Sequence, residues 1–249
     1  MGELTGYAGI VTGGSSGIGL DIANMLAFQG ATVYIISRTG KVKDGFPDSV
    51  AGTIHIKGDI NDKAAMTKII SELADKHEGH LDFLVNNAGT TYKCAAQEVP
   101  EEEFDRVLDT NVKCVFTMSQ LCYPYLKKSP FKGRIINISS MSAHLGFSLV
   151  VPYCTSKAAV CGLTRGLAIE WANDNICVNS IAPGWFHSKM LDEVMDDKRR
   201  QQILNRIPVH DFGDTKDLGA MAAFLIGPHG KYITGQDYAL DGGALAFGY

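Results

Sequence analysis

The stretch Thr12-Gly13-Gly14-Ser15-Ser16-Gly17-Ile18-Gly19 decides the fold, because it joins a short apolar run to a helical pattern. The apolar run, residues 8–11, has the length of a buried strand. Beyond the glycines, apolar side chains recur at helical spacing from Ile18 to Leu26, and Gly30 ends the pattern. A strand, a glycine-rich turn and a helix in that order form the opening unit of a doubly wound α/β domain.

Short apolar runs and helical patterns alternate along the rest of the chain, which is typical of a parallel sheet covered by helices. We expect strands at residues 8–11, 32–36, 53–56, 83–85, 134–138, 176–181 and 238–240. Helical patterns lie near residues 63–77, 101–127, 153–173 and 214–226. The sequence therefore predicts the α/β class: one doubly wound Rossmann-type domain, residues 1–249, with a parallel sheet of roughly seven strands.

Two connections depart from this alternation. Residues 39–52 are rich in Gly, Pro, Lys and Asp, and they are too broken for a full crossover helix. Residues 185–212 form a long mixed connection after the sixth predicted strand. Because insertions of this kind often cover a binding site, we expect this segment to cover the substrate.

Composition and charge indicate which kinds of partner the protein is not built to bind. The 249 residues carry 23 Lys and Arg against 27 Asp and Glu, a net charge of −4 without any run of like charge. Nucleic acid and anionic membranes are therefore unsupported as partners. The six cysteines are scattered and form no Cys-x-x-Cys pair, which suits a reducing compartment and predicts no metal site. Without a secretory leader or an apolar stretch of about 20 residues, we expect a soluble cytoplasmic protein.

The glycine turn also predicts a nucleotide site. Glycines let the backbone approach a pyrophosphate closely, and free N–H groups at the start of a helix attract its charge. The spacing Gly-x-x-x-Gly-x-Gly differs from the commoner dinucleotide fingerprint, so a tight turn without a ligand is the alternative.

The residues after the second and third predicted strands indicate which dinucleotide would bind. An acidic residue at the end of the second strand would hold the ribose of NAD, but the chain has Ser37-Arg38 there. Ser37 does not repel a 2′-phosphate and Arg38 can bind one through its planar fork, so we favour NADP; a solvated Arg38 is the alternative. Asp59 and Ile60 end the third strand, where Asp59 could reach the adenine amino group or cap the helix that starts near Lys63.

Tyr153 and Lys157 are candidates for acid–base chemistry, because the spacing i, i+4 places them on one face of a helix. A phenol with a pKa near 10 is a poor catalyst at neutral pH. A cation about 4 Å away could stabilise the phenolate by up to about 4 kcal/mol at an effective dielectric near 20. A surface lysine beside a packed tyrosine is the alternative for this common pattern.

Polar residues at the ends of other predicted strands strengthen the catalytic interpretation. Ser139-Ser140 follows the fifth strand, and period-two alternation places Ser140 on the face of Ile138 and Ser139 on the opposite face. Asn86-Asn87-Ala88-Gly89 ends the fourth strand at the same sheet edge, where ligands of open α/β sheets bind. Asn111 lies inside a helical stretch in spite of its weak helix propensity.

Together these motifs resemble the short-chain dehydrogenase/reductase superfamily over essentially the whole chain. The resemblance implies hydride transfer between NAD(P) and a carbonyl or alcohol. Tyr153 would be the acid–base residue, with Lys157 lowering its pKa and binding the nicotinamide ribose. Ser140 would hold the substrate oxygen, and the backbone carbonyl of Asn111 would anchor a water of the proton relay. Further contacts to the cofactor are implied for Gly13, Ser15, Ser16, Ile18, Asn87, Gly184, Phe186 and Ser188, besides Arg38.

Within the superfamily, residues 182–190 look most like 3-oxoacyl-thioester reductases and sugar-acid dehydrogenases. We therefore expect an NADP-dependent ketone reductase with a small-molecule substrate, assembled as a homotetramer. One alternative is an NAD-linked sugar-acid, polyol or hydroxysteroid dehydrogenase. Another, from a different class, is a cofactor-binding regulator without catalysis, which the fold alone would permit. Such a regulator usually lacks part of the set Asn111, Ser140, Tyr153 and Lys157.

Overall fold

The computed structural model describes residues 2–187 and 196–247, and a seven-stranded sheet forms its centre. The strands are β1 (Ala8–Thr12), β2 (Thr32–Ser37), β3 (Thr53–Lys57), β4 (Phe83–Asn86), β5 (Gly133–Ile138), β6 (Ile176–Pro183) and β7 (Asp237–Leu240). Their order is β3-β2-β1-β4-β5-β6-β7, and every neighbouring pair is parallel. The predicted single Rossmann-type domain with a parallel sheet is confirmed.

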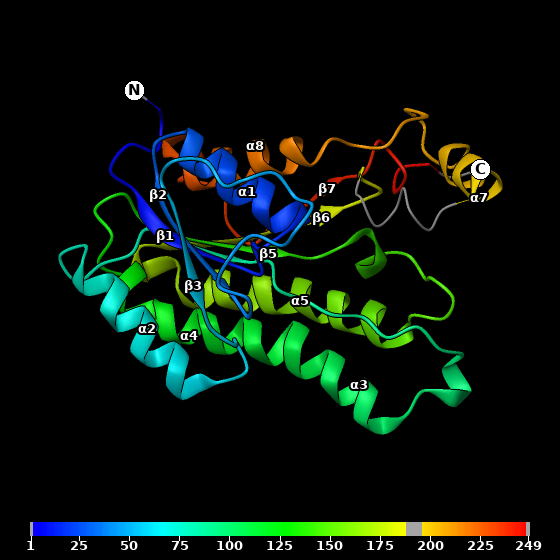
Figure 1. Ribbon diagram of the computed structural model, residues 1–249, viewed down its shortest axis with the longest axis horizontal. Coiled ribbons are helices and arrows are strands. Elements are labelled where there is room, and N and C mark those ends of the chain that lie inside the picture. Colours follow the sequence, from blue (N-terminus) through cyan, green and yellow to red (C-terminus); the bar gives the residue numbers. More distant parts are fainter. Residues whose placement is uncertain (1, 188–195, 248–249) are drawn as a thin grey trace.

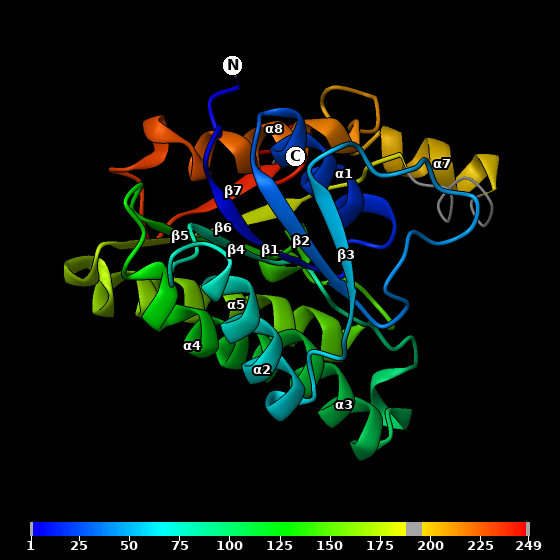
Figure 2. The same cartoon turned by 60° about the vertical axis from the view of Figure 1, so that its left-hand side comes forward.

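Helices cover both faces of the sheet (Figure 1). One face carries α1 (Gly17–Phe28) and α8 (Thr215–Ile226), and the other carries α2 (Lys63–Asp75), α3 (Glu101–Leu108), α4 (Cys114–Leu126) and α5 (Val151–Glu170) (Figures 1 and 2). Apolar residues from alternating positions of each strand fill two cores, one against each helix layer. Among residues 2–187 and 196–247, no helix combines the length and apolar character that a membrane crossing needs.

The chain reverses its direction across the sheet between β1 and β4. From β1 the connections lead outward to β2 and β3, and from β4 they lead the other way to β7. A crevice at the carboxyl ends of the strands opens at such a switch point, and ligands of doubly wound folds bind there. The glycine turn follows β1, and the Asn87-Ala88-Gly89 stretch follows β4, so both reach this crevice.

The structure corrects the predicted helix 101–127. It consists of α3, a π-helical segment η2 (Asp109–Lys113) and α4. The helical periodicity of the sequence continues through η2, so it does not reveal the wider turn. Asn111 lies in this segment, which explains how a residue of weak helix propensity is accommodated there.

The two irregular connections differ from each other. Residues 39–52 contain no helix, as predicted. The connection 185–212 contains α7 (Asp197–Leu204), which the sequence did not predict because its residues have almost no apolar stripe. Short 3₁₀ helices occur at η1 (Ala96–Glu98), η3 (Met141–Ala143), η4 (Ala172–Asp174) and η5 (Pro228–Gly230).

Candidate active site

In the glycine turn after β1, the backbone of Gly13 approaches the backbone of Ala88, which follows β4. Gly13 has a φ of +70°, and a Cβ on it would lie 2.7 Å from the Cα of Ala88. The amide of Asn87 donates hydrogen bonds to the carbonyl oxygens of Thr12 (3.1 Å) and Gly13 (3.2 Å). Asn87 therefore fixes the turn from the neighbouring strand end.

The start of α1 has open hydrogen-bond donors. Its first residues follow Ser16, whose side chain makes no capping hydrogen bond. The first N–H groups of a helix lack intrahelical partners, and they favour an anion together with the helix dipole. This end of α1 fits the pyrophosphate of a dinucleotide.

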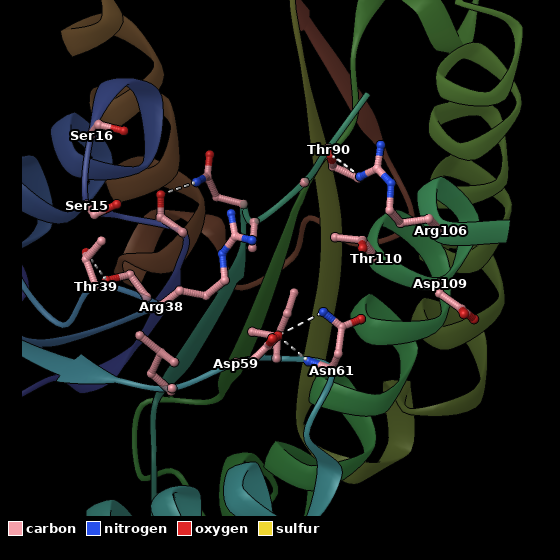
Figure 3. Close-up of a pocket in the computed structure, with 18 of the residues that line it drawn as sticks. Ser15, Ser16, Arg38, Thr39, Asp59, Asn61, Thr90, Arg106, Asp109 and Thr110 are labelled. Carbon is pink, nitrogen blue, oxygen red and sulfur yellow. Dashed lines mark hydrogen bonds between the residues drawn. The ribbon is translucent and has the colours of Figure 1, made fainter. Parts of the chain in front are cut away.

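A cavity of about 850 Å³ lies beside the glycine turn. Its size is in the range of small-molecule sites. Gly13, Ser15, Ser16, Arg38, Asp59, Ile60 and Asn87 all line it, as the sequence predicted for a cofactor site. Figure 3 shows the exposed Arg38 side chain running into this cavity between Ser15 and Asp59.

Lys43 is a second cation at this cavity, and sequence analysis missed it. Its backbone N–H donates to the carbonyl oxygen of Ser15 at 2.9 Å, so the irregular segment 39–52 is pinned to the glycine turn. A basic residue in a connection without a helix gave no signal of its own. Only the fold brings Lys43 to the wall that also carries Arg38.

Asp59 does not cap α2. Asp62 does so, by accepting a hydrogen bond from the backbone N–H of Ala65 at 2.9 Å. Asp59 instead accepts from the backbone and side chain of Asn61, at 3.0 and 2.8 Å. These bonds, aided by the charge of Arg38, hold the pKa of Asp59 below its usual value, although burial opposes them. Asp59 is thus a carboxylate on the cavity wall, free of the helix.

The opposite wall comes from α3 and η2. Figure 3 shows Thr90, Arg106, Asp109 and Thr110 on this side. Arg106 donates to the hydroxyl of Thr90 at 2.8 Å and forms an ion pair with Glu103 at 2.6 Å. The charge of Arg106 is therefore already paired, and its side chain forms part of the cavity wall.

Tyr153, Ser140 and Lys157 come together beyond this cavity. Tyr153 lies in the first turn of α5, and the side chain of Ser140 lies close enough to lower its pKa. The ammonium nitrogen of Lys157 donates to the carbonyl oxygen of Ile138 at 2.7 Å and lies 5.5 Å from the centre of the Tyr153 ring. The side chains of Ser140 and Ser139 make different contacts: Ser140 accepts from the N–H of Ser142, and Ser139 donates to Asp237.

Burial dominates the electrostatics of this group. It lowers the pKa of Lys157 to about 8. It also raises the pKa of Tyr153, although the side chain of Ser140 opposes the rise. The prediction that Lys157 brings the pKa of Tyr153 down is therefore wrong for this structure. The ammonium group is held at the Ile138 carbonyl, and its attraction does not outweigh the loss of solvent around the phenol.

Asn111 lies between the cavity and the group formed by Ser140, Tyr153 and Lys157. Its side-chain amide accepts from the backbone N–H of Thr90 at 2.8 Å and donates to the hydroxyl of Ser156 at 2.9 Å. Gly89 lines the cavity, and a Cβ on it would lie 3.3 Å from Asn111 and 3.8 Å from the Lys157 nitrogen. The cavity and the catalytic side chains are therefore neighbours along one sheet edge.

Known proteins resemble this chain in sequence and fold. A family model described as enoyl-(acyl carrier protein) reductase matches residues 13–244. The chain is 34% identical over 250 residues to a 3-oxoacyl-(acyl-carrier-protein) reductase of Thermotoga maritima, which covers 98% of this chain and 99% of the relative. The chain is a short-chain dehydrogenase/reductase.

Two further relatives of this short-chain dehydrogenase/reductase act on sugar acids by name. The 2-dehydro-3-deoxy-D-gluconate 5-dehydrogenase of Bacillus subtilis is 35% identical over 253 residues, covering 98% of this chain and 96% of the relative. The solved structure of a gluconate 5-dehydrogenase from Burkholderia cenocepacia, in complex with NADP and tartrate, has a TM-score of 0.88 at 28% identity. It covers 98% of this chain and 97% of that one. This enzyme is thus an oxidoreductase for alcohol or ketone groups with a nicotinamide dinucleotide.

Five residues predicted to contact the cofactor do not line the cavity of this short-chain dehydrogenase/reductase: Tyr153 and Lys157, which lie beyond it, and Ile18, Gly184 and Phe186. Ile18 packs against the core under α1. Gly184 donates its N–H to the carbonyl oxygen of Leu240 at 2.8 Å, and Phe186 is a buried core residue bridged to Gly213. Ile18 belongs to the glycine turn, and Gly184 and Phe186 follow β6. Their contacts to a cofactor stay predictions. Ser188 lies outside the described residues.

Proposed function

We propose that this enzyme is an NADP(H)-dependent carbonyl reductase that converts a 3-oxoacyl thioester or a similar ketone to a secondary alcohol. The grouping of Ser140 and Lys157 around Tyr153 carries the proposal. It joins a proton donor and an oxygen-binding hydroxyl at one point of the crevice. An intact set of these residues also weighs against a regulator without catalysis.

Each of the three side chains has a distinct task in this reaction. The cofactor, when bound, supplies the hydride. The hydroxyl of Ser140 would hold the carbonyl oxygen of the substrate, and Tyr153 would donate a proton to that oxygen. The phenol, whose pKa burial raises, keeps its proton at neutral pH and can give it to the substrate oxygen. Lys157, 5.5 Å from the ring, would then stabilise the phenolate that remains.

The preference for NADP rests on the cations of the cavity. Arg38 and Lys43 both line it, and Ser37 before them carries no charge. A guanidinium can bind a 2′-phosphate through two parallel hydrogen bonds, and a second cation adds to this attraction. NADP in the gluconate 5-dehydrogenase structure is in accord with this preference.

The substrate preference rests on the segment between Ser140 and Tyr153. It contains no lysine or arginine, and its Leu145 and Leu149 are 40% and 42% exposed. Phe147 of this segment forms an edge-to-face pair with Trp185, with ring centres 6.5 Å apart. Apolar walls without a cation suit a ketone with an apolar substituent better than the carboxylate of a sugar acid.

An assay of cofactor oxidation over a carbonyl panel tests the proposal. The panel contains a 3-oxoacyl thioester, simple ketones, a keto sugar acid and a ketosteroid, each with NADPH and with NADH. We expect the fastest turnover with the thioester or an apolar ketone and NADPH. Preference for the keto sugar acid with NADH would instead favour the NAD-linked alternative, and no turnover on any member would overturn the proposal.

We propose in addition that the enzyme is a cytoplasmic homotetramer with two-fold axes. Apolar side chains on the outer surfaces of three helices support this assembly: Phe116 of α4, Ile169 of α5 and Phe224 of α8 are 39%, 78% and 45% exposed. Light scattering at micromolar concentration should give four times the mass of the chain, whereas the mass of one chain would contradict the assembly.

A further inference from the structure

The carboxylate of Asp237, at the start of β7, bonds to residues on both sides of Ser140. One oxygen, Oδ1, accepts a hydrogen bond from the hydroxyl of Ser139 at 2.6 Å. The other, Oδ2, lies 2.6 Å from Nε2 of His144. Ser139 directly precedes Ser140, and His144 follows it by four residues. A single side chain from another strand thus joins the two ends of the segment that carries the substrate-binding hydroxyl.

The surroundings of Asp237 keep its carboxylate charged and fixed. Only 11% of the side chain is exposed. Burial by itself would raise the pKa of Asp237, but hydrogen bonds from Ser139, Ser180 and its other partners outweigh burial and hold the pKa below its usual value. Cys161 of α5 is one of these partners, with Sγ at 3.4 Å from Oδ2. The carboxylate is therefore an ionised anchor connected to three neighbouring elements of the fold.

Asp237, His144 and Cys161 are also the kinds of residues that bind divalent metals, and their donor atoms lie within 4.8 Å of one another. The spacing of His144 and Asp237 favours a direct bond instead. Two ligands about 2.0–2.1 Å from one tetrahedral zinc would lie about 3.3 Å apart. The observed 2.6 Å is the distance of a hydrogen bond to a carboxylate.

We propose that Asp237 is a positioning residue for the reaction, acting through Ser139 and His144 to hold Ser140 in place beside Tyr153. The proposal rests on the proposed role of Ser140 in substrate binding. Ser140 itself has an extended backbone, and its side chain accepts from the N–H of Ser142 at 3.2 Å, so its orientation follows that of the segment. Fixing both ends of that segment fixes the hydroxyl.

The loss of this anchor should reduce turnover and leave cofactor binding intact. Misplacement of a reacting group by about 1 Å can reduce a rate by about 100-fold. We expect Asp237→Asn to lower kcat by about 10–100-fold, because asparagine keeps the size but loses the charge and one acceptor. The dissociation constant of NADPH should stay within about twofold, because Asp237 does not line the cofactor cavity.

A second position tests the same connection with less risk to folding. The side chain of His144 is 43% exposed. His144→Gln keeps an N–H donor for Asp237 and should stay within about threefold of the wild-type kcat, whereas His144→Leu should lose about tenfold. Asp174→Asn is the matched control, because Asp174 accepts hydrogen bonds from Tyr123 and Lys127 far from the site. It should leave kcat unchanged.

A double-mutant cycle with Ser140→Ala separates positioning from general stability. If Asp237 acts through Ser140, Asp237→Asn should add almost nothing to the loss caused by Ser140→Ala. Additive losses, or an unchanged kcat in Asp237→Asn and His144→Leu, would overturn the proposal.

Amide hydrogen exchange gives a readout that needs no substrate. Residues 139–144 should exchange faster in Asp237→Asn than in wild type or Asp174→Asn, and unchanged exchange would also overturn the proposal. Inactivity of the wild type on every carbonyl would contradict the proposed function, and the exchange result would still decide whether Asp237 anchors the segment.

Discussion

The two ends of strand β5 each bury a cation against backbone carbonyl groups, but they surround it in opposite ways. At the amino end, the guanidinium of Arg134 donates to the carbonyl oxygens of Leu225 (3.1 Å), Lys132 (2.8 Å) and Gly227 (3.4 Å). At the carboxyl end, Lys157 donates to the single carbonyl of Ile138. Burial lowers the pKa of both cations, and it lowers that of Lys157 to about 8, so the charge of Lys157 is costly to keep there.

The buried polar side chains near the two ends of β5 also differ in how completely they are hydrogen-bonded. At the amino end, the buried carboxylate of Asp82 accepts from the backbone of Ala8 (2.7 Å) and from the hydroxyl of Ser129 (2.6 Å). At the carboxyl end, the hydroxyl of Ser142 is buried without a hydrogen-bond partner, one of two such side-chain atoms in residues 2–187 and 196–247. Saturated polar groups stabilise the fold, whereas unsaturated ones are available to a ligand.

The largest effect should come from Tyr153→Phe, which removes the proton donor at the carboxyl end. General acid–base catalysis contributes about 10²–10⁴-fold, so turnover should fall at least that far. Folding and NADPH binding should be nearly unchanged, because phenylalanine keeps the ring. Steady-state kinetics with thermal unfolding as the control measures both, and wild-type turnover in this variant would contradict the assignment.

Arg134→Met should destabilise the structure at the amino end of β5. Methionine fills much of the volume, but the carbonyl oxygens of Leu225 in α8 and Lys132 before β5 lose this donor, whereas that of Gly227 keeps the N–H of Gly230. Each unsatisfied buried group costs about 1–3 kcal/mol, so we expect the free energy of unfolding to fall by about 2–4 kcal/mol. The folded fraction should keep its kcat within about twofold. Urea unfolding and turnover per folded molecule test the prediction, which a large loss of kcat without a loss of stability would refute.

Lys157→Met should stabilise the protein at neutral pH. In the unfolded chain the lysine keeps its proton up to about pH 10.5, whereas in the folded protein its pKa is about 8. At pH 7 the folded state therefore bears a cost of about 3 kcal/mol, which declines as the pH rises from 8 toward 10.5. Unfolding between pH 7 and 9.5 should show wild type gaining stability relative to Lys157→Met. A constant difference over this range would contradict the lowered pKa.

The smallest effect concerns Arg38, an exposed cation on the cavity wall. Loss of its charge-assisted bonds to a 2′-phosphate should weaken NADPH binding by about tenfold, near the lower end expected because solvent screens the pair. Arg38→Ala should scarcely change the affinity for NADH, which lacks the phosphate. Lys41→Ala, a nearby lysine that does not line the cavity, is the control. Equal losses of affinity for NADPH and NADH in titrations would show that Arg38 does not bind the 2′-phosphate.

Much of the fold could be predicted, because its signals are local. Strand-length apolar runs placed all seven strands within two residues at either end. The π-helical segment around Asn111 and helix α7 could not be predicted, since the first continues a helical periodicity and the second lacks one. Their stability depends on contacts made elsewhere in the fold, such as the bonds of Asn111 to Thr90 and Ser156.

In the candidate site, too, local sequence signals predicted some features, whereas others depend on contacts that only the fold creates. The residue types and spacing of the site identified Ser140, Tyr153 and Lys157, but the sign of the pKa shift of Tyr153 depends on burial, which the spacing does not contain. Lys43 reaches the cofactor cavity through a loop contact. Asp237 meets His144 across 93 positions of the chain, a pairing that only the sheet creates.

The most direct test of the contrast is to measure unfolding and turnover for Lys157→Met and Arg134→Met in the same samples at pH 7. Two buried cations at the two ends of strand β5 are compared, Arg134 on the strand and Lys157 on helix α5, so a general effect of removing charge from the interior would move both variants alike. We predict opposite results: Lys157→Met at least as stable as wild type with turnover reduced by 100-fold or more, and Arg134→Met destabilised by about 2–4 kcal/mol with turnover per folded molecule preserved. Equal losses of stability in both variants, or an active Lys157→Met enzyme, would contradict the account.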